Sequence, residues 1–146
     1  MKGMYKHLLI PTDGSQRSHA AAVHAIALAK QLNCWVTGLS VIITSGVPTR
    51  DSEAVDRAQA WLSVIAAEAE AAGVSCSTVM LRQERASEAI VHAAETMGCD
   101  LIVMASPGPE RAAGMHGSET EGVLAYSRIP VLIHRLREAS AKPSRA

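Results

Sequence analysis

Short apolar runs alternate with longer segments along this chain, and that alternation limits the folds it can adopt. The clearest run is residues 100–106, DLIVMAS, an apolar stretch bounded by residues that favour turns. Such a run is typical of a strand buried on both faces, as the strands of parallel sheets are. Parallel neighbours need a crossover between them, which is usually a helix. The alternation therefore predicts an α/β domain in which helices cover both faces of a parallel sheet.

The pattern predicts five strands and four helices in strict alternation. We expect strands at residues 7–10, 35–43, 74–81, 100–106 and 130–134. Apolar residues at helical spacing predict helices over 18–32, from 51 or 52 to 72, from Ser87 as N-cap to Gly98, and from about 118. No internal repeat or linker divides the 146 residues, so we expect one domain.

The composition restricts the partners and the compartment of this domain. Aromatic residues make up 3% of the sequence against 48% hydrophobic residues, so the core must consist of aliphatic side chains. Lys plus Arg equal Asp plus Glu at 14 each, a balance that argues against nucleic acid and anionic membranes as partners. No apolar run is long enough for a membrane span, and the first is too short for a signal peptide. We therefore expect a cytoplasmic protein.

The cysteines and histidines are not spaced for a metal site. Cys34, Cys76 and Cys99 lie far apart at the edges of apolar runs, where a small buried hydrophobe is the simplest interpretation. His19 and His24 are five residues apart on a predicted helix, which is not the i, i+4 spacing of a helical metal pair. We expect no metal ligands.

The loop after the fourth predicted strand is the segment best suited to bind a ligand. In parallel α/β sheets, ligands bind beyond the carboxyl ends of the strands, where the strand order reverses. This loop carries Gly108, Gly114 and Gly117, with Ser118 at the head of a helix. Glycines let backbone amides approach a phosphate, and a helix N-terminus adds free N–H groups. A phosphate cradle and an ordinary loop before a capped helix both fit these residues.

Four segments resemble the universal stress protein family: LLIPTDGS at the first strand, LSVI at the second, DLIVMAS at the fourth and GSETEGVLAYSRIPVLIHR at the end. The resemblance implies an adenine nucleotide alpha hydrolase-like fold, with sheet order 3-2-1-4-5 and two helices on each face. The family domain would span residues 1–137, and residues 138–146 would form a flexible tail. The resemblance also implies a homodimer that pairs through the last strand, residues 130–135.

The same resemblance implies an ATP site. Members that bind ATP share Gly-x2-Gly-x9-Gly-Ser/Thr after the fourth strand. Gly108, Gly117 and Ser118 match this pattern, but Ala105 stands at its first glycine and the interval from Gly108 to Gly117 is one residue short. Asp13 and Val41 match positions that line the adenine and ribose. The expected nucleotide-binding residues are therefore Pro11, Thr12, Asp13, Val41, Ala105, Gly108, Gly117 and Ser118.

Two functions fit this sequence. The first is a stress-response protein that binds ATP, acts as a homodimer and catalyses no demanding reaction. The second is an interaction module of the same fold that has lost the nucleotide, which Ala105 and the shortened loop favour. A third class, enzymes of related α/β architecture, is discounted because the chain has neither an S-G-G-x-D-S loop nor an acidic pair after the first strand. We expect no catalytic residues.

Overall fold

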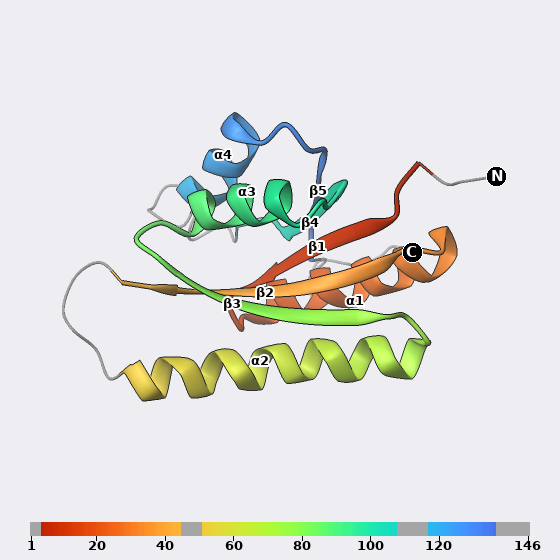
Figure 1. Cartoon of the computed structure of the whole chain (residues 1–146), viewed down its shortest axis with the longest axis horizontal. Coiled ribbons are helices and arrows are strands. Elements are labelled where there is room, and N and C mark those ends of the chain that lie inside the picture. Colours follow the sequence, from red (N-terminus) through yellow and green to blue (C-terminus); the bar gives the residue numbers. More distant parts are fainter. Residues whose placement is uncertain (1–3, 45–50, 108–116, 137–146) are drawn as a thin grey trace, which may run out of the picture.

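The computed structural model describes residues 4–44, 51–107 and 117–136, and within them strands and helices alternate as the sequence predicts (Figure 1). The elements are β1 (His7–Thr12), α1 (Gln16–Leu32), β2 (Trp35–Ile43), α2 (Asp51–Ala72), β3 (Cys76–Gln83), α3 (Ala86–Thr96), β4 (Leu101–Ala105), α4 (Gly117–Tyr126) and β5 (Val131–His134). The predicted C-terminal tail, residues 138–146, lies outside the described residues.

The described strands lie parallel in one sheet, in the order β3-β2-β1-β4-β5. β1 is the central strand, and it pairs with β2 over its whole length and with β4 through Leu8 and Leu9. The predicted parallel sheet and its order 3-2-1-4-5 are confirmed. The order reverses between β1 and β4, because the chain first builds outward from β1 to β3 and then continues on the other side of β1.

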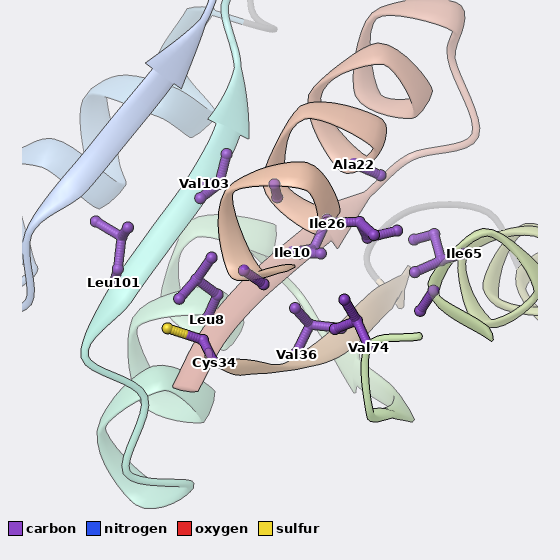
Figure 2. Packing of buried hydrophobic residues seen from close by; sticks show 13 residues of the cluster. Leu8, Ile10, Ala22, Ile26, Cys34, Val36, Ile65, Val74, Leu101 and Val103 are labelled. Atoms are coloured by element: carbon purple, nitrogen blue, oxygen red, sulfur yellow. The ribbon is translucent and has the colours of Figure 1, made fainter. Parts of the chain in front are cut away.

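Different helix pairs cover the two faces of the sheet (Figure 1). Leu8 and Ile10 of β1 point to one face, where they join residues of α1 and α2, Ile65 among them, in a buried cluster (Figure 2). Leu9 points to the other face, in a cluster with residues of α3 and with Val123 of α4. The three β1 side chains are 0% exposed. The prediction of two helices on each face is confirmed.

α1 begins earlier than predicted. Ser15 is its N-cap, because Ser15 Oγ accepts a hydrogen bond from Ser18 N at 3.1 Å, and the helix therefore starts at Gln16. Ser18, the predicted start, lies in the first turn, where its hydroxyl donates to the carbonyl of Ser15 at 3.0 Å. Asn33 ends the helix in the left-handed conformation, with φ 62°, so the helix stops at Leu32 as predicted.

The prediction that Ser87 caps α3 is wrong. The N-cap is Arg85, which makes no capping hydrogen bond through its side chain. Ser87 lies inside the first turn and faces α4, where a Cβ added to Gly122 would come within 2.7 Å of its hydroxyl oxygen. The two helices approach closely at this point, so Ser87 contributes packing between helices instead of a cap.

β3 begins later than predicted, at Cys76 instead of residue 74. Val74 is still engaged by the preceding helix, because its N–H donates to the carbonyl of Ala69 at 2.9 Å. That bond closes the end of α2, and Gly73, with φ +77°, makes the turn. The chain is therefore free to pair with β2 only after this turn.

The turn between β1 and α1 packs against α2 through a glycine. Gly14 has φ +82°, a conformation that favours glycine, and its N–H donates to Thr12 Oγ1 at 3.1 Å. A Cβ at this position would overlap the Trp61 indole of α2. The turn therefore requires a residue without a side chain, both for its backbone conformation and for its packing.

Replacing Gly14 with alanine should destabilise the protein more than a positive φ alone explains. Gly98→Ala is the matched control, because Gly98 has φ +72° but no atom within 4 Å of an added Cβ. The control should lose about 1–2 kcal/mol of unfolding free energy from backbone strain, and Gly14→Ala at least about 1 kcal/mol more from the overlap with Trp61. Chemical denaturation measures both values. Equal losses would show that the contact with Trp61 has no energetic role.

A buried histidine lies at the amino-terminal edge of the sheet. His7 is 3% exposed, its Nε2 lies 2.7 Å from Thr37 Oγ1, and the Trp35 ring stacks on it with centroids 3.6 Å apart. Burial lowers the pKa of His7 below its ordinary value of 6.5, although the negative charge of Asp100 and a backbone hydrogen bond oppose this effect. The fold therefore favours the neutral imidazole.

Mild acid should consequently weaken the fold. Because the pKa of His7 is lower in the folded than in the unfolded chain, the unfolded chain takes up the proton first, and stability falls as pH drops below about 6.5. His134 adds to the effect, since burial and the nearby His24 lower its pKa too. Urea unfolding at several pH values should show the unfolding free energy falling as the pH drops. His7→Gln should weaken this pH dependence, whereas His92→Gln, at an exposed position of α3, should leave it unchanged. An equally strong pH dependence in His7→Gln and in the unchanged protein would contradict this account.

Candidate functional site

A cavity of about 490 Å³ opens at the carboxyl ends of β1, β2 and β4. It lies where the strand order reverses between β1 and β4, the place predicted for a ligand in this class of fold. Its size falls within the range of roughly 300–1,000 Å³ that is typical of small-molecule sites. The lining residues are Pro11, Thr12, Asp13, Ser15, Arg17, Ser18, Leu39, Val41, Ile43, Trp61, Ala86, Ile90, Met104, Ala105, Ser106, Pro107, Glu119 and Thr120.

One wall of the cavity is apolar and is formed mainly by β2. Leu39, Val41 and Ile43 alternate along this strand, so their side chains share one face of the sheet. Ile90 of α3 lines the same cavity, and it belongs to the buried cluster against which Val41 packs. This wall suits a flat apolar group such as an aromatic ring.

The opposite wall, called the polar wall below, combines polar side chains with the apolar Met104 and Ala105, and is formed by the end of β4 and the first turn of α4. Ser106 and Thr120 bring hydroxyl groups to the cavity, and Glu119 brings a carboxylate. The first turn of a helix has free N–H groups and a partial positive charge, which attract anions. Pro107 lines the cavity but has no N–H to donate.

The β1–α1 turn forms the floor between the two walls and is held by its own hydrogen bonds. Asp13 Oδ1 accepts a bond from Ser15 N at 2.9 Å, and the hydroxyl oxygens of Thr12 and Ser18 lie 3.0 Å apart. Arg17, in the first turn of α1, lines the same space. These contacts set the direction in which the Asp13 and Thr12 side chains face the cavity.

Few of the described lining residues are ionisable. Among the described residues that line it there is no histidine, cysteine or lysine, and its ionisable side chains are Asp13, Arg17 and Glu119. In the part of the chain that the structure describes, no group of three or more His, Cys, Asp or Glu residues could hold a metal ion. The arrangement offers apolar surface, hydroxyls and a helix N-terminus to a bound molecule.

The two histidines considered for a metal pair have other neighbours. His19 Nε2 lies 3.2 Å from Glu68 Oε2, and the His24 ring packs at a tilt on His134, with centroids 4.8 Å apart. The two side chains thus face different elements, α2 and β5.

No helix within residues 4–44, 51–107 and 117–136 is long and apolar enough to cross a membrane.

The structure brings five of the predicted site residues to the cavity: Pro11, Thr12, Asp13, Val41 and Ala105. Gly108 lies outside the described residues. Gly117 and Ser118 begin α4, next to the polar wall. Their part in ligand binding stays a prediction.

Sequence reasoning missed three lining residues that carry distinctive side chains. Arg17 lies two residues after the LLIPTDGS segment, in the first turn of α1, and Glu119 lies inside the GSETEGVLAYSRIPVLIHR segment, in the first turn of α4, so their positions could have indicated them. Trp61 left no such signal. It lies in the middle of α2 and reaches the cavity only because that helix packs against the turn at Gly14.

Comparisons with known proteins agree with this fold. The family model described as the universal stress protein family matches residues 4–135. A universal stress protein of Methanocaldococcus jannaschii is 36% identical over 144 residues, which cover 90% of this chain and 83% of that protein.

Solved structures show the same similarity. The structure of the hypothetical protein MJ0577 is 28% identical, has a TM-score of 0.77, and covers 93% of this chain and 99% of its own. A universal stress protein in complex with cAMP is 23% identical, with a TM-score of 0.74 and coverage of 89% and 97%. Together, the family match and the relative at 36% identity show that this chain belongs to the universal stress protein family.

Proposed function

We propose that this protein binds an adenine nucleotide in the cavity at the carboxyl ends of β1, β2 and β4, and acts as a nucleotide-responsive stress protein, not as an enzyme. The observation that carries the proposal is the polarity of the cavity. An apolar wall on β2 and a helix N-terminus beyond β4 face each other across the end of β1. A nucleotide has the same polarity, with a flat base at one end and phosphate at the other.

The dimensions of the sheet support this orientation. Neighbouring strands lie about 4.8 Å apart, so β2 and β4, which flank β1, are about 10 Å apart. That separation is close to the distance between the base and the phosphate of a nucleotide. Val41 and Pro11 would contact the adenine and Asp13 the ribose, while Ser106 and Thr120 would lie nearest the phosphate. Gly108, Gly117 and Ser118 would complete the phosphate end.

ATP is the nucleotide that the family resemblance implied, and a similar structure was solved with cAMP, which supports adenine nucleotides as a class for this fold.

One observation favours the second candidate, an interaction module without nucleotide. At the polar wall, Ala105 carries a methyl group where ATP-binding members have glycine, and Pro107 has no N–H. These two residues should weaken phosphate binding without closing the cavity.

Isothermal titration calorimetry with AMP and ATP tests the proposal. Val41→Phe should lower the affinity at least about tenfold, because the larger ring fills the space beside β2 that the adenine would occupy. Val23→Phe is the matched control: Val23 is 41% exposed on α1 and does not line the cavity, so affinity should be unchanged. Ala105→Gly should tighten binding, since it removes a methyl group from the polar wall. Absence of binding at millimolar nucleotide by both the unchanged protein and Ala105→Gly would favour the interaction module.

We also propose that the protein works as a cytoplasmic homodimer paired through β5. β5 lies at the edge of the described sheet, and its four side chains are only partly buried. The carbonyls of Pro130 and His134 accept hydrogen bonds from the β4 side. Because the N–H and C=O of one residue point to the same side of a strand, Val131 and Ile133 direct theirs away from β4, where a second copy can pair with them.

Light scattering should therefore give about twice the 15.4 kDa of one chain. Ile133→Pro removes one outward-facing N–H and should shift the protein towards monomer. Ile133→Ala is its control, since it loses the same side chain but keeps the amide, and it should remain a dimer. A monomer mass for the unchanged protein at high micromolar concentration would refute the pairing, and identical masses for the two variants would place the interface elsewhere.

A further inference from the structure

Glu119 lines the half of the cavity where a nucleotide would present its phosphates. The residue lies in the first turn of α4 and lines the cavity together with Ser106 and Thr120. Its Oε1 is covered by protein and has no hydrogen-bond partner among the described residues. Nothing in the described part of the site therefore neutralises this oxygen directly.

The charge of the lining is unusual for a site that would hold a polyphosphate. Such sites commonly surround the phosphates with Lys, Arg or a metal ion. Here the described lining has two carboxylates, Asp13 and Glu119, against one guanidinium, Arg17. The carboxylates thus outnumber the cation in the described part of the cavity.

The position of Glu119 along α4 makes its charge effective. The free N–H groups of a helix N-terminus attract a phosphate because they carry partial positive charge. An acidic side chain in the first turn already interacts with that charge. A ligand phosphate at the same helix end would meet both the amides and the carboxylate, and every additional phosphate would add repulsion that the described lining residues do not match with a further cation.

We infer that Glu119 is a specificity-determining residue, which makes this cavity prefer an adenine nucleotide with a single phosphate over ATP. The inference rests on the proposed function, because it assumes that the adenine lies on β2 and the phosphate at α4. The preference would be a property of this sequence, because it depends on the Glu119 side chain and not on the backbone of the fold.

The test compares AMP and ATP by calorimetry in EDTA, so that no divalent cation offsets the phosphate charge. Glu119→Gln keeps the size and shape of the side chain and removes its charge. This variant should tighten ATP binding about tenfold and AMP binding clearly less, because ATP carries more charge close to the carboxylate. Glu121→Gln is the matched control: it makes the same change in net charge, on the same helix, at an exposed residue outside the cavity lining. It should leave the ratio of the two affinities unchanged.

A second measurement needs no variant and so does not depend on whether Glu119→Gln folds. Salt screens the repulsion between the carboxylate and the phosphates, so raising the ionic strength from about 0.05 M to about 0.5 M should narrow the preference of the unchanged protein for AMP over ATP. A preference for ATP at low salt would overturn the inference.

The remaining outcomes separate the inference from the proposed function. If Glu119→Gln shifts both affinities equally, or if Glu121→Gln shifts their ratio as much, Glu119 does not determine the selectivity, although the cavity still binds nucleotide. If neither nucleotide binds to any of the proteins, the proposed function itself fails and the selectivity falls with it.

Discussion

The structure depends on the burial of β1 on both faces. Leu8, Leu9 and Ile10 are 0% exposed, so neither face of the central strand contacts water. Side chains alternate along a strand, which means that one helix layer can cover only half of them. The chain therefore needs α1 and α2 on one face and α3 and α4 on the other, and the crossovers that deliver these helices make the neighbouring strands parallel.

The same arrangement gives the two ends of the sheet different properties. At the amino-terminal edge, the buried side chains of His7 and Thr37 and the exposed side chain of Ser77 form a chain of hydrogen bonds, with Nε2–Oγ1 and Oγ1–Oγ distances of 2.7 and 2.9 Å. At the carboxyl edge, the segment after β1 leads to a helix on one face, and α4, which follows β4 in the chain, lies on the other. The connections diverge there and leave the cavity open. A binding site at this edge thus follows from topology, whereas its chemistry follows from the particular side chains.

The cavity combines features that the fold provides with individual side chains of this sequence. The apolar wall on β2 and the helix N-terminus beyond β4 belong to the architecture. Ala105 and Glu119 are individual side chains of this sequence, and both lie on the β4–α4 side of the cavity, away from the apolar wall on β2. Under the proposed function, shape and charge would act differently: the shape would favour a nucleotide, and the charge would limit the number of its phosphates.

The sequence by itself determined the class of fold, because continuous apolar runs such as residues 100–106 can be satisfied only by burial on both faces of a sheet. The family resemblance carried by segments of the sequence also placed Pro11, Thr12, Asp13 and Ala105 in one site, and these residues line the cavity. The tertiary structure decided what depends on contacts between distant segments. Ser87 packs on Gly122 instead of capping α3, and Trp61 reaches the cavity because α2 packs on Gly14. The local pattern of apolar residues specifies each element and the face it buries. The contacts between a helix and a turn or helix far away in the sequence are set only when the layers pack together.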